Sequence, residues 1–340
     1  MVGFHMLNFQ QEKHDYTIYN NDSHVVGYDG NIYFINHYEV NHKMNYALSY
    51  LPIDFDQTNL NSVRPINLIQ FRTVQPGEKL KIDSGLIFYQ YAGNTYYYRL
   101  EDGKSDRFCE GNLQYLDMSS NRYVTLYKGS LYEGRFFSGT YNTYEINQLT
   151  TSNMVKMEED KDNIYYYAAE KKPVLVGLRK SDFAFLIYDI IDQSEYHLSK
   201  IKLTNKEVIE LLESGDSYYS APINIKSKEK GKLTLANEEE VASFDKNPTS
   251  GYIATIENEK IVLYENGNKI SEIPHDFSGD LEISLNYVEK IKNNLYYDVT
   301  LKTKAEEGFL TKMSRFLIEV DLTNGNSYQV NTGAQLRKIS

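Results

Sequence analysis

Six short segments of this 340-residue chain share one pattern, in which a Gly or Asn turn residue usually precedes β-branched and aromatic residues. They are GNIYFINHY at 30–38, GLIFYQY at 85–91, RYVTLY at 122–127, NIYYYAA at 163–169, GYIATIE at 251–257 and NLYYDVTL at 294–301. Such residues suit a pleated, half-buried strand. Their spacing is about 40 residues or twice that: 41 residues separate Tyr123 from Ile164, and 89 separate Ile164 from Ile253. This repeat predicts an array of small β units rather than one large core.

Hairpin turns accompany these strands. RLEDGKSDRF at 99–108, LYENGNKISEI at 263–273 and EVDLTNGNSYQV at 319–330 each place Asp-Gly or Asn-Gly between strands, which suits tight type I′ turns. In FLIEVDL at 316–322, Phe316 and Ile318 fall on one face, while Glu319 falls on the other. That alternation predicts a strand with one buried face.

Four-stranded antiparallel units that repeat every 40–45 residues or so are typical of a β-propeller. The Gly-x-Ile-Tyr-Phe strand followed by an x-Leu-x-Asp-x-x-Asn-Gly hairpin resembles the blades of bacterial β-propeller proteins, including TolB-like and related uncharacterised families. The chain has no Trp and no Gly-Gly pair, so it lacks the tryptophan-aspartate and Kelch signatures. The resemblance implies a binding platform at a central channel and assigns no functional residue.

The length sets the expected number of blades. At about 44 residues per blade, 340 residues make just under eight, and insertions reduce that number. We expect an all-β propeller of six to eight four-stranded blades, with seven favoured, as a single domain over residues 1–340. A hairpin near 16–26 would complete the sheet formed by the C-terminal strands, closing the ring and removing free sheet edges.

One segment departs from the β pattern. LTNKEVIELLESGD at 203–216 carries a capping-box spacing at Thr204 and Glu207, an apolar set that includes Val208 and Leu212, and Gly215 at its end. This pattern predicts a short helical insertion over 203–215.

Charge limits the partners. Lys and Arg number 36 and Asp and Glu number 47, giving a formal net charge of −11, which disfavours nucleic acid. The basic stretch KSKEKGK at 226–232 has no aromatic residue and is interpreted as a solvated loop. No apolar run approaches the roughly 18 residues that span a bilayer. We expect a soluble protein, cytoplasmic as given, or secreted or surface-attached if a leader was removed.

Chemical signatures are weak. Five of the seven histidines, His5, His14, His24, His37 and His42, fall early in the chain without the spacing of a metal site. The single cysteine, Cys109, allows no intrachain disulfide and is expected to be structural. Nucleophile-elbow, P-loop and dinucleotide-binding motifs are absent. We therefore predict no metal, no cofactor and no catalytic residue, and leave open whether the protein is an enzyme while favouring that it is not.

The segment LYEGRFFSGTYNTY at 131–144 is the strongest candidate for a contact surface. It contains Tyr132, Arg135, Phe136, Phe137, Tyr141 and Tyr144. Tyr and Arg dominate interface hot spots because they bury much area and keep a polar tip. The alternative is a strand pair that contributes to a blade core.

Three functions remain open on the sequence. The favoured one is a non-enzymatic binding or scaffold module that recognises a protein or peptide through loops on one propeller face. A hydrolase or lyase, for example one acting on a glycan, would instead carry acidic residues at the channel mouth. A secreted, cell-envelope or phage structural component is the third. The richness in Asn, Lys, Ile and Tyr indicates a bacterial or phage source with AT-rich genes.

Overall fold

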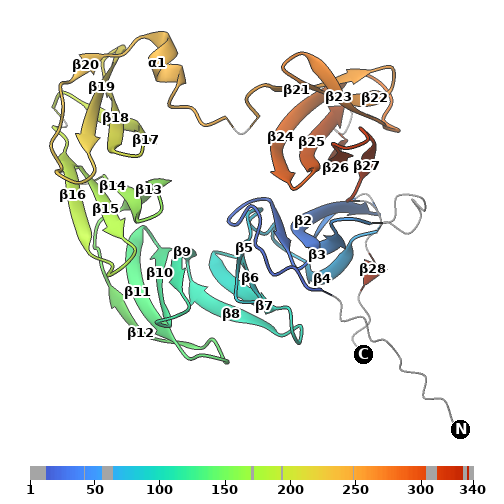
Figure 1. Cartoon of the computed structure of the whole chain (residues 1–340), viewed down its shortest axis with the longest axis horizontal. Coiled ribbons are helices and arrows are strands. Elements are labelled where there is room, and N and C mark those ends of the chain that lie inside the picture. The colour runs from blue at the N-terminus through green and yellow to red at the C-terminus, as the bar shows by residue number, and fades with distance from the viewer. Residues whose placement is uncertain are drawn as a thin grey trace, which may run out of the picture. The chain divides into compact units, whose positions relative to one another are not determined.

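The computed structural model describes residues 13–41, 43–55, 64–169, 172–192, 194–247, 249–303, 312–331 and 335–336. Short antiparallel strands dominate and form seven sheets in chain order (Figure 1). The chain divides into two compact units. Unit 1 comprises Met1–Ala92, Tyr96–Asp106 and Pro248–Ser340, and unit 2 comprises Gly93–Thr95 and Arg107–Asn247.

Three sheets belong to unit 1. The first contains β1 (Val25–Tyr28), β2 (Asn31–Val40), β3 (Lys43–Pro52), β4 (Ile66–Phe71) and β28 (Gln335–Leu336). The second contains β21 (Tyr252–Glu257), β22 (Lys260–Glu265) and β23 (Asn268–Pro274). The third contains β24 (Leu281–Ile291), β25 (Asn294–Thr303), β26 (Met313–Asp321) and β27 (Ser327–Gln329). A fourth sheet has strands in both units: β5 (Lys81–Asp83), β6 (Leu86–Tyr91), β7 (Asn94–Arg99) and β8 (Ser105–Glu110).

Unit 2 holds three four-stranded sheets. The first of these contains β9 (Asn112–Asp117), β10 (Arg122–Tyr127), β11 (Ser130–Phe136) and β12 (Thr143–Gln148). The second contains β13 (Met154–Glu159), β14 (Asn163–Ala168), β15 (Val174–Arg179) and β16 (Phe185–Ile190). The third contains β17 (His197–Leu203), β18 (Glu207–Ser214), β19 (Ser217–Asn224) and β20 (Thr234–Leu235). The helix α1 (Glu238–Ala242) follows β20 (Figure 1).

These sheets confirm the predicted all-β, seven-bladed propeller fold. All six segments of the sequence repeat lie in strands: β2, β6, β10, β14, β21 and β25. Five sheets have four strands, the first has five, and the sheet β21–β23 has three. The repeat was detectable because most of these segments are the second strand of a blade, where neighbours cover both faces. In β14 every residue is buried, and Tyr165 and Tyr166 are fully so.

The predicted helix over 203–215 is wrong. That segment ends β17, turns at 204–206 and continues as β18, which pairs antiparallel with β17 and β19. The expected capping contact exists, since the Glu207 amide donates to Thr204 Oγ1 (3.0 Å), but it closes a β-turn. Gly215 has φ +58° in the next turn instead of ending a helix. The sequence of this segment resembles a helix because β18 has buried residues on both faces, so its apolar and polar residues do not alternate as in a half-buried strand.

The one described helix, α1, is only five residues long and is capped by Asn237, whose side chain accepts from the Glu240 amide. Three glutamates in its first turn favour this position through the helix dipole. Among the residues that the structure describes, no helix is long and apolar enough to cross a membrane.

The short strand β28 joins the first sheet of unit 1. β28 pairs in parallel with β4, with Gln335 opposite Ile66. The segment 16–26 instead makes isolated bridges, Tyr19 to Gly27 and Ser23 to Leu80, before β1 begins. The C-terminal strand thus joins the N-terminal sheet, the reverse of the expected arrangement, and closure of residues 1–340 into one ring stays a prediction.

Candidate functional site

The hairpin β11–β12 contains the predicted contact residues. β11 pairs with β12 with Arg135 opposite Tyr144, and a register shift lies between Glu133 and Arg135. β12 is the edge strand of its sheet, whose order is β12-β11-β10-β9. At the tip, the Phe137 amide donates to the Asn142 carbonyl (3.0 Å), which closes the loop.

Two aromatic side chains at this tip stack in a partly exposed position. The ring centroids of Phe137 and Tyr144 lie 4.2 Å apart with an interplanar angle of 17°. Phe137 is 54% exposed, and next to the pair Arg135 Nε lies 3.5 Å from Glu145 Oε2. Ile146, farther along β12, is 55% exposed. The tip therefore presents an apolar aromatic face and a guanidinium beside β12, which has β11 as its one partner among the described strands.

The six predicted residues do not all share this surface. Phe136 is 1% exposed and packs its ring against Phe108 (5.4 Å), so it belongs to the core, as the alternative interpretation required for this residue. Tyr132 is half-buried near Tyr127, at the other end of β11 from the tip. Tyr141 is half-buried in the turn with φ +57°.

The surface that we name the tip patch consists of Arg135, Phe137 and Tyr144.

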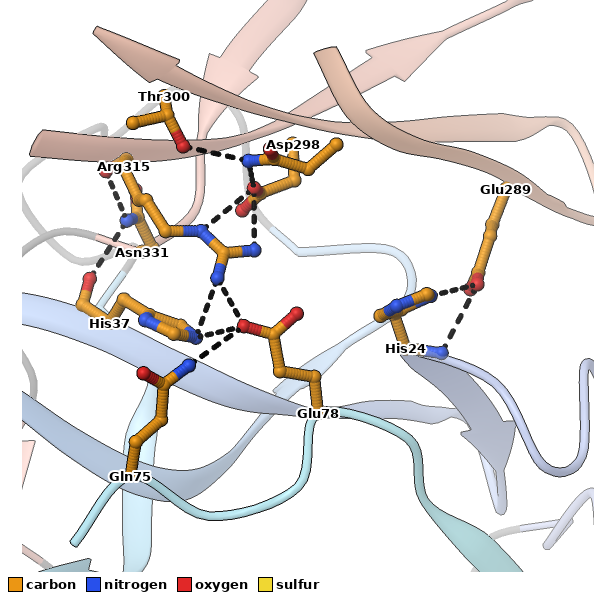
Figure 2. A network of polar contacts seen from close by, with 10 residues as sticks. His24, His37, Gln75, Glu78, Glu289, Asp298, Thr300, Arg315 and Asn331 are labelled. Atoms are coloured by element: carbon orange, nitrogen blue, oxygen red, sulfur yellow. Dashed lines mark hydrogen bonds and ion pairs between the residues drawn. The ribbon is translucent and has the colours of Figure 1, made fainter. Parts of the chain in front are cut away.

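A cluster of polar side chains, which the sequence did not predict, lies in unit 1. Figure 2 shows Arg315 of β26 between two carboxylates, Asp298 of β25 and Glu78 in the loop before β5. Arg315 Nε and Nη2 donate to Asp298 Oδ1 (2.9 and 2.7 Å), and Nη1 donates to Glu78 Oε1. His37 Nε2 of β2 lies 3.1 Å from Arg315 Nη1 and 3.4 Å from Glu78 Oε1.

Amides complete this cluster. Asn286 Nδ2 donates to Asp298 Oδ1 (2.6 Å) and to Thr300 Oγ1 (2.9 Å). Asn331 Nδ2 donates to the backbone carbonyls of His37 (2.9 Å) and Arg315 (2.8 Å), as Figure 2 also shows. The cluster therefore joins the first sheet to the sheet β24–β27 through side chains and main chain.

The electrostatics of the cluster follow from these contacts. The hydrogen bond from His37 and the Arg315 guanidinium lower the pKa of Glu78 to about 2, against the effect of burial. Burial raises the pKa of Asp298, which is 4% exposed on its side chain, and Arg315 opposes that shift. Arg315 engages both carboxylates, so the cluster links the first sheet to the sheet β24–β27.

Nearby, His24 makes a separate contact that also ties these sheets together. Glu289 Oε1 accepts from the His24 amide (3.1 Å) and lies 3.0 Å from His24 Nδ1, while Oε2 accepts from the Val25 amide (2.8 Å). The His24 ring stacks on Tyr287 at 4.1 Å.

The other histidines considered as metal ligands, and the cysteine, lie as follows. His5 and His42 lie outside the described residues. His14 contacts Asp29 (3.0 Å) at the surface. In the part of the chain that the structure describes, no group of three or more His, Cys, Asp or Glu side chains could hold a metal ion. Cys109 is 4% exposed, and burial raises the pKa of its thiol to about 12, which disfavours the nucleophilic thiolate.

The class of protein that these sheets define is a β-propeller. No protein-family model and no curated protein matches the chain. Solved structures resemble it weakly. A prolyl endopeptidase is 9% identical with a TM-score of 0.46, covering 92% of this chain and 49% of that one. Oligopeptidase B from Leishmania major is 12% identical with a TM-score of 0.46 over the same shares.

TolB from Acinetobacter baumannii, a propeller of the kind that the sequence resembled, is 12% identical. Its TM-score is 0.34, covering 71% of this chain and 62% of TolB. By comparison, this chain spans about half the length of the prolyl endopeptidase and of oligopeptidase B. The assignment of the fold rests on the seven sheets themselves.

Proposed function

We propose that this protein is a non-enzymatic binding module that recognises a protein or peptide through the tip patch of the hairpin β11–β12. The observation that carries the proposal is the stacked pair of Phe137 and Tyr144, with Phe137 54% exposed. An exposed ring stacked on a half-buried tyrosine, beside an arginine, has the aromatic and arginine composition of an interface hot spot. Arg135 adds a guanidinium that can donate hydrogen bonds to a carboxylate or a backbone carbonyl of the partner.

The open edge of β12 suggests how an extended segment would bind. A peptide that adds a strand to a sheet edge gains main-chain hydrogen bonds, and side-chain contacts beside the edge provide specificity. Phe137 and Tyr144 lie next to that edge, and Ile146 extends the apolar contact along it. Glu145, with φ +47°, lies opposite the register shift between Glu133 and Arg135.

The hydrolase or lyase alternative has less support. The Arg315 cluster is the richest group of acids described above, and its carboxylates are engaged by the same guanidinium. The tip patch, by contrast, has no buried acid or base. A binding role therefore accounts for the exposed groups more directly than a catalytic one.

Affinity capture followed by titration calorimetry tests the proposal. The purified chain is used to recover partners from extracts of its source, and each recovered protein is titrated against the wild type, the double variant F137A/Y144A and the control Y16A. Tyr16 is 64% exposed in unit 1, so its loss removes an exposed ring outside the patch. We expect the double variant to lose more than tenfold in affinity, about 1.4 kcal/mol or more, and the control to bind normally. Equal losses in both variants, or none in either, would overturn the proposal.

A further inference from the structure

The lysine-rich segment 226–232 is anchored to the neighbouring sheet, although the sequence predicted a solvated loop. Lys228 Nζ donates to Tyr188 Oη (3.0 Å) and lies 4.2 Å from the centroid of that ring. Lys230 Nζ pairs with Asp189 and lies 2.8 Å from Glu210 Oε2. Tyr188 and Asp189 belong to β16, whereas the segment connects β19 to β20, so two lysines fasten one sheet of unit 2 to the next.

Glu210 is the unusual member of this contact. It lies on β18 with 0% exposure, and its cross-strand neighbours are Ile201 (4%) and Ala221 (0%). The charged groups that face it are Lys230 from the segment and Asp189 from β16. Burial raises the pKa of Glu210 to about 7, while Lys230 lowers it and Asp189 raises it further.

The two carboxylates therefore respond differently to acid. Asp189 is 17% exposed on its side chain and pairs with the same ammonium, whereas Glu210 is enclosed by apolar side chains. A carboxyl in an apolar setting takes up a proton near neutral pH more readily than one near water. Once neutral, Glu210 no longer attracts the Lys230 ammonium as an ion.

We propose that segment 226–232 is a proton-controlled clasp between the sheets β13–β16 and β17–β20, in which ionised Glu210 holds Lys230 and protonation of Glu210 in mild acid weakens that hold. The proton comes from solvent and adds to a carboxylate oxygen of Glu210. Asp189 keeps its ion pair, so the clasp loosens without opening fully. This device is independent of the tip patch.

Hydrogen exchange of the segment tests the clasp. The Lys228 amide donates to the Asn224 carbonyl (2.9 Å) and the Gly231 amide to the Pro222 carbonyl (2.7 Å), so both report closure. After correction for intrinsic exchange rates, we expect protection at pH 5.5 to be about tenfold lower than at pH 8.5 in the wild type. In E210Q, protection should equal the low-pH value of the wild type at both pH values.

Two further variants keep the test decisive. H197N removes the histidine that begins β17 and should leave the pH dependence intact. D189N should lower protection at both pH values while keeping the pH dependence. The proposal is overturned if the wild type shows equal protection at both pH values, if E210Q keeps the pH dependence, or if H197N abolishes it.

Discussion

We expect Glu319 to make the stability of this protein fall as the pH rises towards 8. Its side chain is 0% exposed on β26, between the cross-strand residues Tyr296 and Tyr328. Burial raises the pKa of Glu319 to about 8, the contact with Tyr296 lowers it, and Asp321 and Asp54 raise it further. The folded state therefore favours the protonated acid, whereas the unfolded chain ionises near pH 4.5 or so.

The sign and size of the effect follow from this difference. Because the folded pKa lies above the unfolded value, the stabilisation is fully present below about pH 4.5 and is lost as the pH rises through about 8. Between pH 5 and pH 8 the loss amounts to about 3 kcal/mol in the free energy of unfolding.

The substitution E319Q isolates the contribution of Glu319, because a glutamine of similar shape carries no charge at any pH. Urea unfolding followed by far-ultraviolet circular dichroism suits a chain without Trp. We expect E319Q to match the wild type at pH 5 within about 1 kcal/mol and to exceed its stability by about 3–4 kcal/mol at pH 8.5. E101Q, at an exposed turn position, should follow the wild type throughout. Parallel pH profiles of E319Q and the wild type would refute the reasoning.

Three other substitutions or probes test separate parts of the structure. R315M leaves the buried Asp298 without its cation and should lower the free energy of unfolding, measured in urea, by about 3–5 kcal/mol. A loss below about 1 kcal/mol would contradict the claim that Arg315 joins the two sheets. Cys109 should react with a thiol reagent at neutral pH only after denaturant is added, and rapid labelling of the folded chain would contradict its burial. G134A places a methyl group 2.2 Å from the Tyr123 ring and should cost about 1–3 kcal/mol, seen as a lower thermal midpoint, whereas an unchanged midpoint would mean that the ring moves aside without cost.

The strand repeat could be predicted from the sequence because its signal is local. Turn residues and apolar pleats lie within a few residues of one another, and RYVTLY at 122–127 coincides with β10. β18 was missed because burial on both faces hides the alternation that marks a strand, and because Thr204 and Glu207 form the same hydrogen bond in a β-turn as in a helix cap.

The buried acids could not be predicted in the same way. The alternation in 316–322 predicts that Glu319 lies on the face opposite the buried one, yet Leu317 on that same face packs against Val25 and Ile32 of the first sheet and is buried. Asp298 and Arg315 lie on the adjacent strands β25 and β26, but Glu78 comes from the loop before β5, and it reaches Arg315 only because segments far apart in the chain pack together. Within the predicted patch, composition alone could not show that Phe136 points into the core while Phe137 points out.

Site-specific photo-crosslinking tests the central claim, recognition through the tip patch, most directly. A photoreactive phenylalanine analogue is placed at position 137 in one sample and at position 16 in another, and each sample is illuminated with the captured partner. The account predicts a covalent adduct from position 137 and none from position 16, since Phe137 lies in the tip patch and Tyr16 does not. An adduct from position 16 alone, or equal yields from both positions, would contradict it.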